Sequence, residues 1–545
     1  MREVLGEDHG APVCQWASQV LLGAANLEQT KLQSCRDLSL MLGPEVLGCP
    51  DHQRKILSEL AADASLVQNI LRWNFQRVGG QEMSDFYFDP HTKHYTGKQN
   101  VLKGWCAKIR WADKVMHGDF VHSTGGHPLY LENTDNYEDM RQRFKKLEDN
   151  FRAALAISPE KELSWVIDRG IFSMEIFEWV LQTPQIHLIT WEKGYQRDAW
   201  PEGKPATGSM KVERSRNNKA DKHSYSFEWI EDKWPKNCKL RRIIVRAQNP
   251  EGNRVEVSIL ADDWKRAAKE IVWLMFDRWI QENDFKYLDE HFGINQITSY
   301  RSQTYAQIRG ELEDREMKNA AHTALQRARR EEQGRMGKLL VAQRESKRKG
   351  EHRIKEMAKL EALKKPGKEQ RQRLGRLKGA QRSAEKYVKQ RDEKIAHIQK
   401  EIDGLDKKME ETDKDVSRLD HLVEKGAQRL CGERKLLMDV IKITARNLFC
   451  EKLVPFKEGY DNYRDDHVWF RHLTRSGGVI EPKGEEAVRC HLIAEADYPK
   501  PVGSVIRRLL ASFNRSEVRL PDGSQRKAEL VLGSKSAIEL ADQNA

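Results

Sequence analysis

The stretch 164–170 reads SWVIDRG and decides the fold, because it is a short apolar run that ends in an acidic residue, Asp168. The stretch 85–91, DFYFDPH, has the same pattern earlier in the chain and ends its apolar run at Asp89. Apolar runs of this length predict buried β-strands. A carboxylate at the end of a buried strand lies at the edge of a sheet, where the sites of α/β folds form. We therefore expect an α/β fold with Asp89 and Asp168 at a sheet edge.

A third acidic residue, Glu282, lies in the predicted helical stretch 278–286, RWIQENDFK. Three carboxylates that converge repel one another unless cations lie between them. Two divalent cations held by such a set activate a water or a 3′-hydroxyl and stabilise the leaving oxygen of a phosphodiester. The pattern predicts a metal-dependent phosphoryl-transfer site in which Asp89, Asp168 and Glu282 are both the catalytic residues and the metal ligands.

Each of these residues also has a purely structural explanation. An aspartate at the end of a strand is commonly a turn former or a helix cap. Glu282 has Arg278 four residues before it and Lys286 four residues after it, which allows a simple ladder of ion pairs. Arg169 and Lys193 are either phosphate contacts or ordinary surface charges. His91 is either a ligand of a metal or phosphate, or a residue that only shapes the site.

Composition excludes several classes of protein. The chain has 545 residues, of which 39% are hydrophobic and 32% charged, and no run of 18 apolar residues occurs, so no transmembrane span is predicted. The N-terminus lacks a basic stretch followed by an apolar one, so no secretory signal is predicted. Eight cysteines are scattered without a C-x-x-C pair, which argues against a zinc site or a disulfide framework and favours reduced thiols.

The net charge of +11 is concentrated in one segment. Residues 321–390 hold 22 Lys and Arg against 8 Asp and Glu, whereas the rest of the chain is close to neutral. Clustered positive charge of this kind indicates a polyanion partner such as a nucleic acid, although a solvated helix face gives the same composition without any partner.

The same segment carries a coiled-coil pattern. From Leu374 to Val423, twelve of fifteen positions spaced alternately by three and four residues are apolar. Pro366-Gly367 interrupts the helical pattern in the middle of the segment. We therefore expect residues 306–430 to form a long antiparallel coiled-coil hairpin that turns at 366–367, with arms of about 57 residues that span about 85 Å. A parallel homodimeric coiled coil is the alternative.

Three further regions flank these features. Residues 1–80 read as helical, with Asp51 as a candidate N-cap, and form either a DNA-binding helix-turn-helix or a plain helical packing domain. Residues 81–305 contain the acids and include a β-rich stretch at about 195–262, with a predicted hairpin around 249–252. Residues 267–279 are predicted to be one helix. Residues 431–545 read as a C-terminal α/β region, with strands near 488–493 and 528–532.

The motifs resemble those of the DDE transposases of bacterial insertion sequences, whose catalytic core has an RNase H-like fold. The resemblance rests on 88–97 (FDPHTKHYTG), 166–170 (VIDRG), 189–194 (ITWEKG) and 276–287 (FDRWIQENDFKY), and returns at 460–467 (YDNYRDDH) and 471–475 (RHLTR). The Arg278-x-x-x-Glu282 spacing is similar to the signature that one large transposase group has around its acidic helix. That signature also has a Tyr and a Lys where this chain has Met275 and Asp289, while Lys286 lies nearer.

The resemblance implies an RNase H-like catalytic core with a β-rich insertion before the last acid. Asp89, Asp168 and Glu282 would then be the three acids in order, holding two Mg²⁺ ions, with Mn²⁺ as an alternative. The implied activity is that of a DNA transposase that cleaves a strand at the end of a mobile element and transfers the freed 3′-OH to target DNA. Arg169, Lys193, Arg278 and Lys286 would contact DNA.

The implied partners are double-stranded DNA, as element ends and target, and further copies of the chain in a homo-oligomer, with no membrane. The implied location is the cytoplasm, associated with the nucleoid. Two other functions stay open. The chain could be a metal-dependent nuclease that cuts without joining, or a domesticated or inactive transposase derivative that serves as a DNA-binding or scaffold protein.

Overall fold

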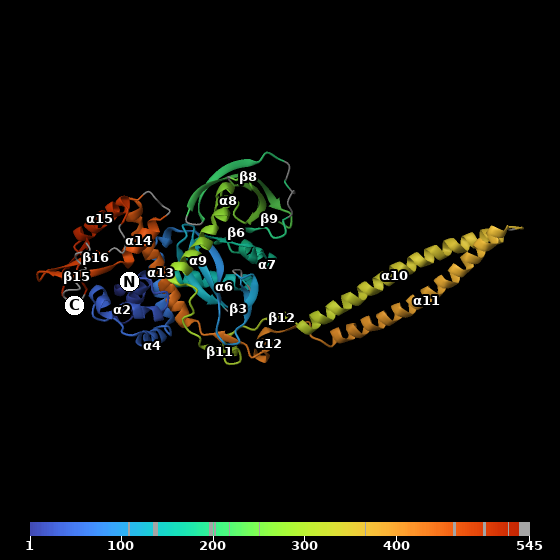
Figure 1. Cartoon of the computed structure of the whole chain (residues 1–545), viewed down its shortest axis with the longest axis horizontal. Coiled ribbons are helices and arrows are strands. Elements are labelled where there is room, and N and C mark those ends of the chain that lie inside the picture. The colour runs from blue at the N-terminus through green and yellow to red at the C-terminus, as the bar shows by residue number, and fades with distance from the viewer. Residues whose placement is uncertain are drawn as a thin grey trace. The chain divides into compact units, whose positions relative to one another are not determined.

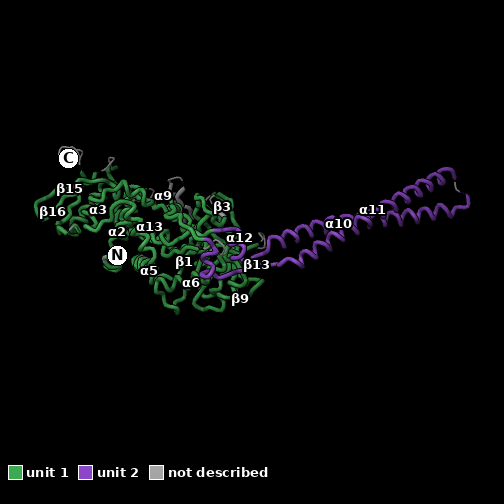
Figure 2. Tube along the Cα trace, turned by 90° about the horizontal axis from the view of Figure 1, so that it is seen from below, with its two compact units in different colours: residues 1–303, 428–545 green, residues 304–427 purple. Residues whose placement is uncertain are grey.

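The computed structural model describes residues 1–106, 109–134, 140–195, 200, 203–216, 219–249, 251–365, 367–460, 465–493, 498–521 and 523–533. The chain divides into two compact units, one made of residues 1–303 and 428–545 and the other of residues 304–427 (Figure 2). Residues 461–464, which belong to one of the motifs that resemble transposases, and the chain beyond residue 533 lie outside the described residues. None of the described helices combines the length and the apolar character that crossing a bilayer requires.

The first unit begins with helices, as the pattern of residues 1–80 predicts. These are α1 (Arg2–Leu5), α2 (Glu7–Leu21), the 3₁₀ helix η1 (Leu27–Leu32), α3 (Cys35–Leu42), α4 (Pro50–Leu60), α5 (Ala64–Arg77) and the 3₁₀ helix η2 (Gly80–Glu82). The expectation for Asp51 is wrong, because Cys49 is the N-cap of α4 and Asp51 lies in its first turn. Pro50 starts the helix instead, since proline lacks the amide hydrogen that the first helical position leaves unpaired.

A large mixed sheet forms the centre of this unit. Its strands are β1 (Asp85–His94), β2 (Lys103–Cys106), β3 (Trp111–Ser123), β4 (Pro128–Thr134), β5 (Leu163–Ile167), β6 (Ile186–Trp191), β7 (Ala206–Arg216), β8 (Lys219–Trp234), β9 (Asn237–Gln248) and β10 (Arg254–Ala261). The spatial order is β2-β3-β1-β5-β6-β10-β9-β8-β7. β4 lies outside this order and pairs with β3. β1, β5 and β6 are parallel to one another, and the other pairings are antiparallel. The expected α/β class is confirmed.

The two faces of this sheet are covered by different helices. Phe86, Phe88 and Trp165 point to the face that packs on α6 (Met140–Leu155), where Phe86 and Trp165 both contact the ring of Phe151. The alternate residues Tyr87 and Val166 belong to a second core with α8 (Ala268–Asp277). This alternation follows from the two-residue period of a strand. Each fully buried aromatic side chain contributes about 1.5–3 kcal/mol to folding.

The β-rich stretch is continuous with the central sheet. β10 pairs with β6 in antiparallel register, and β9, β8 and β7 follow it in order. Figure 1 shows β8 and β9 curving beside α8, whose Ile271 and Val272 are fully buried against this part of the sheet. The predicted hairpin around 249–252 corresponds to the connection between β9 and β10. The helix predicted over 267–279 corresponds to α8, which ends at Asp277, and a second helix, α9 (Trp279–Phe292), begins after Arg278.

The chain returns to the first unit with the long helix α13 (Glu433–Lys457), which packs against α2, α5, α9 and β4. The remaining elements are η3 (Arg169–Ile171), α7 (Met174–Gln182), β11 (Ser302–Thr304), β14 (Gln428–Leu430), α14 (Asp466–Arg475), β15 (Gly477–Lys483), β16 (Ala487–Ile493), α15 (Lys500–Arg515) and β17 (Lys527–Leu532). β15, β16 and β17 form a small separate sheet.

The second unit consists mainly of two long helices, α10 (Ala320–Glu361) and α11 (Lys368–Glu410), which end and begin on either side of the Pro366-Gly367 dipeptide. They run antiparallel, because Arg329 of α10 pairs with Asp406 of α11 while Glu361 pairs with Lys378. η4 (Arg309–Glu311), β12 (Glu316–Lys318), β13 (Asp415–Ser417) and α12 (Arg418–Glu424) complete this unit.

Candidate functional site

The register of two strands places the first two acids side by side. Phe88 of β1 is the partner of Ile167 of β5 in the parallel ladder, and Asp89 and Asp168 are the next residues of each chain segment. Neighbouring strands lie about 4.8 Å apart, so the two aspartates are neighbours at this end of the β1-β5 ladder. The expectation that Asp89 ends its strand is wrong, because β1 continues to His94 along β3, whereas Asp168 does follow the end of β5. Asp168 also caps η3 by accepting a hydrogen bond from the backbone N–H of Arg169 at 2.8 Å. The capping role and the place beside Asp89 are therefore both present.

Helix α9 carries the third acid. Gln281 is fully buried and donates hydrogen bonds through Nε2 to the carbonyl oxygen of Phe120 at 3.3 Å and to Nδ1 of His122 at 2.9 Å. Glu282, the next residue, has 52% of its side chain exposed. The helix thus fixes its inner side on β3 while it presents Glu282 to the solvent.

A guanidinium group joins two of the acids. Arg278 donates from Nη2 to Oε1 of Glu282 at 3.1 Å, and its Nη1 lies 3.9 Å from Oδ2 of Asp89. Only 12% of the Arg278 side chain is exposed, and Nη1 has no hydrogen-bond partner among the described residues. A cation therefore already lies between Asp89 and Glu282, and it belongs to the protein itself.

The charges around Asp89 affect its protonation. Burial raises the pKa of Asp89 to about 7, against the opposing effect of the Arg278 guanidinium, and the negative charges of Asp168 and Glu282 raise it further. Burial, which has the largest effect on this pKa, and the two neighbouring negative charges all disfavour the ionised Asp89 carboxylate. The arrangement would therefore gain from an added cation.

The carboxylate oxygens of Asp89, Asp168 and Glu282 suit a hard divalent cation such as Mg²⁺. A bound cation would also offset the repulsion between these carboxylates. In the arrangement described, however, no three His, Cys, Asp or Glu side chains of the described residues are close enough together to hold one metal ion. Glu282 is instead paired with Arg278, which also lies 3.9 Å from Asp89. The carboxylates are therefore suitable metal ligands, but a metal ion would have to compete with Arg278 for Asp89 and Glu282.

Three of the four predicted DNA-binding residues are open to solvent. Arg169, directly after Asp168, has 69% of its side chain exposed. Lys193 follows β6, the strand next to β5, and Lys286 lies one turn beyond Glu282, and both are exposed. Arg278 differs, because it is mostly buried between the acids. Arg169, Lys193 and Lys286 are free to contact phosphates near the acids. Arg278 would first have to break its interactions with Glu282 and Asp89.

His91 lies under helix α9. Its ring stacks on Phe285 with 4.5 Å between ring centroids, and its Nε2 contacts Oδ1 of Asn295 at 2.7 Å. Burial lowers the pKa of His91 to about 4, so the ring is neutral near pH 7. Of the two roles considered for His91, its contacts are those of a residue that shapes the site.

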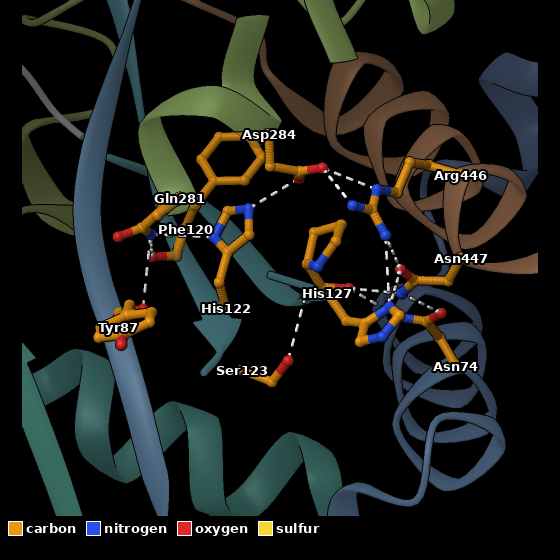
Figure 3. A network of polar contacts seen from close by, with 11 residues as sticks. Asn74, Tyr87, Phe120, His122, Ser123, His127, Gln281, Asp284, Arg446 and Asn447 are labelled. Carbon is orange, nitrogen blue, oxygen red and sulfur yellow. Dashed lines mark hydrogen bonds and ion pairs between the residues drawn. The ribbon is translucent and has the colours of Figure 1, made fainter. Parts of the chain in front are cut away.

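A buried polar network behind α9 escaped sequence analysis (Figure 3). Asp284, two residues after Glu282, accepts from Nε of Arg446 on α13 at 2.7 Å and lies 3.0 Å from Nε2 of His122 on β3. Burial disfavours the charged carboxylate, but Arg446 and His122 outweigh that effect and hold the pKa of Asp284 below its usual value. The only sequence signal was the helical spacing that puts Gln281 and Asp284 on one side of α9.

The network continues into the N-terminal helices. Arg446 also contacts Nδ1 of His127 at 3.3 Å, and the neighbouring Asn447 donates to Oδ1 of Asn74 on α5 at 3.0 Å. The helix that carries Glu282 is thus fixed by residues from β3, α13 and α5 together.

Comparisons with known proteins show a distant likeness in structure only. No protein-family model matches the sequence, and no curated protein matches it. Among solved structures, the piggyBac transposase in a synaptic complex with hairpin DNA matches with a TM-score of 0.29 and 10% sequence identity. The match covers 52% of this chain and 60% of that chain, so this chain spans less than two thirds of the structure it matches. A likeness this distant does not assign the chain to a family.

Proposed function

We propose that this protein is a DNA transposase of the DDE type, which cleaves a DNA strand at the end of a mobile element and joins the freed 3′-OH to target DNA. The observation that carries the proposal is the β1-β5 register, which sets Asp89 beside Asp168, together with Arg278, which donates to Glu282 and lies 3.9 Å from Asp89. The motif likeness to the transposases of bacterial insertion sequences agrees with this assignment.

The topology around the acids supports an RNase H-like core. β1, β3 and β4 form an antiparallel meander, and β5 and β6 then add on the other side of β1 in parallel, connected through α6 and α7. In this assignment β7 to β10 are an insertion before the helix of the third acid.

Asp89, Asp168 and Glu282 would hold the Mg²⁺ or Mn²⁺ ions. When bound, the metal supplies activation of the attacking water or 3′-hydroxyl and stabilisation of the leaving oxygen. Arg169, Lys193 and Lys286 bind and orient the phosphates of duplex DNA, because they are exposed beside the acids. Arg278 balances the negative charge of Asp89 and Glu282 until DNA or metal replaces it. We infer a homo-oligomer, because two element ends that are joined to target DNA together need one active site each.

One observation favours a second candidate. Because Arg278 ties up Glu282 and lies beside Asp89, the same structure suits a transposase derivative that binds DNA without cutting it. A nuclease that cuts but does not join would use the same residues as the proposed enzyme.

Cleavage assays separate these candidates. The DNA that flanks the coding region supplies the substrates, with Mg²⁺ or Mn²⁺ present, and a pre-cleaved duplex with a 3′-OH end tests joining. We expect cleavage and joining by the natural protein, and a loss of about 10²–10³-fold or more in Asp89→Asn, Asp168→Asn and Glu282→Gln. Glu290→Gln, an exposed residue on the same helix, is the matched control. Cleavage without joining would indicate the nuclease, and retained cleavage in all three variants would refute the assignment.

A further inference from the structure

The hairpin of α10 and α11 divides into two halves of very different charge. We define the turn half as residues 344–390 and the open half as residues 320–343 together with 391–410. The turn half holds 17 Lys and Arg against 6 Asp and Glu, whereas the open half holds 10 against 8. Both halves are helical and both are mostly exposed. Exposed helices need charged residues for solubility, but these can be of either sign. The nearly balanced charge of the open half therefore shows that the excess of positive charge in the turn half is not a requirement of solubility.

The positive charges of the turn half are available at its surface. All of its Lys and Arg residues are exposed except Arg353, which is half-buried. Two of its six acids are already used between the helices, since Glu356 pairs with Arg373 and Glu361 with Lys378. Outside these two pairs, 15 Lys and Arg remain against four acids, which is still a large excess of positive charge.

We propose that the turn half of the hairpin is a binding surface for the phosphate backbone of duplex DNA. An 18-residue helical arm such as 344–361 spans about 27 Å, at 1.5 Å per residue. Duplex DNA carries one negative charge per about 1.7 Å, or about 16 charges over that length. The 17 cations of the turn half match that density.

The composition of this surface also indicates which parts of DNA it contacts. Tyr387 is the only Phe, Tyr or Trp between residues 344 and 390. The turn half therefore offers almost no aromatic side chain on which an unpaired base could stack. Contacts from Lys and Arg to phosphates position a protein without reading sequence. The turn half thus adds affinity for any duplex, separately from recognition of element ends near the acids.

This inference rests on the proposed function only for the choice of DNA as the polyanion, and its test does not depend on catalysis. The full-length protein is titrated with a fluorescent 30-base-pair duplex in EDTA at several salt concentrations, with binding followed by anisotropy. The turn set replaces Arg348, Lys355, Lys386 and Lys389 with Gln. The open set replaces Arg330, Lys338, Lys394 and Lys400 with Gln, which removes the same charges from the same two helices.

We expect the turn set to flatten the plot of log K against log[salt] by about 0.9 for each phosphate that the variant no longer neutralises, and by at most about 3.6. The open set should leave the slope unchanged. Exchange of Lys for Arg and Arg for Lys at the four turn positions should restore it. An unchanged slope in the turn set, or an equal decrease in both sets, would overturn the proposal. Tighter binding of duplex RNA than of duplex DNA at every salt concentration would overturn the choice of DNA.

A second measurement on the natural sequence does not depend on how the variants fold. Lysine acetylation followed by mass spectrometry compares the free protein with the DNA complex. DNA should protect Lys347, Lys355 and Lys386 and should leave Lys338 and Lys400 as reactive as in the free protein. Equal reactivity of all five lysines with and without DNA would contradict the proposal even if the variants misfold.

Discussion

Phe88 of β1 and Ile167 of β5 are partners in a parallel ladder, and an aspartate follows each of them. This single register sets Asp89 beside Asp168, although 78 residues separate them along the chain. A shift by one residue would turn one of the aspartates to the opposite face, because side chains alternate along a strand. The candidate site therefore depends on the buried apolar residues that fix the register as much as on the acids.

Replacing Asp89 by Asn should stabilise the metal-free protein at high pH. Since the pKa of Asp89 is raised to about 7 in the folded protein, the folded state keeps a proton that the unfolded chain releases near pH 4. The natural protein thus loses stability as the pH rises from about 4 to 7, by on the order of 2–4 kcal/mol. Asp89→Asn should raise the melting temperature in EDTA at pH 8 clearly more than at pH 5. An equal change at both pH values would contradict the raised pKa.

Removing the guanidinium of Arg278 should favour metal binding. Arg278 lies 3.9 Å from Asp89 and donates to Glu282, so its charge opposes any cation that approaches these acids. A unit charge about 4 Å away interacts by up to about 4 kcal/mol near a protein surface. We expect Arg278→Gln to bind Mn²⁺ at least tenfold more tightly in calorimetry, whereas Arg278→Lys should stay near the natural affinity. Weaker binding by Arg278→Gln would show that Arg278 helps to position the acids.

Breaking the pair of Asp284 and Arg446 should destabilise the fold. The Asp284 side chain is buried and only 12% of the Arg446 side chain is exposed, so removing one partner leaves the other charge unpaired, which costs about 3–5 kcal/mol. Asp284→Ala should lower the free energy of unfolding by this amount in urea denaturation. The double variant Asp284→Leu with Arg446→Met removes both charges and should lose less than the single variant. A single variant as stable as the natural protein would show that the pair contributes nothing.

Gly293, which ends α9, should not tolerate a side chain. Its φ is +62°, in the left-handed region, and an added Cβ would lie 2.5 Å from Cβ of Ala25 and 2.8 Å from its carbonyl oxygen. The left-handed conformation alone costs about 1–2 kcal/mol for alanine, and the contact with Ala25 adds to it. Gly293→Ala should lower the melting temperature, while Gly477→Ala, which meets open space, should not. A stable Gly293→Ala protein would mean that α9 ends differently.

The elements whose sequence pattern is local can be predicted from the sequence alone. Residues 163–167 form β5 as the unbroken apolar run predicts, and the strand at Phe86 to Phe88 was found although β1 continues to His94. β3 went unnoticed because its buried stretch contains Asp119, which is fully buried and pairs with Arg143 of α6 at 2.8 Å. A buried charged residue interrupts the apolar pattern that predicts a strand, and the distant residue that neutralises it cannot be identified from the local sequence.

The support of the candidate site could not be read from the sequence for a similar reason. Asp284 looks like any helical acid until Arg446, 162 residues later, is packed against it. Arg278 was considered as a partner of Glu282, and that pair is present, but its approach to Asp89 depends on how α9 lies on the sheet. Contacts between distant segments arise from packing, which no local pattern reports.

Binding of Mn²⁺ to the full-length protein tests most directly whether the three acids act as one site. Calorimetry, with electron paramagnetic resonance to count free Mn²⁺, compares the natural protein with Asp89→Asn, Asp168→Asn and Glu282→Gln, and with Glu290→Gln as the control. We predict that the natural protein and Glu290→Gln bind Mn²⁺ alike and that each of the other three variants loses most of that affinity. Natural affinity in all three variants would contradict a shared metal site.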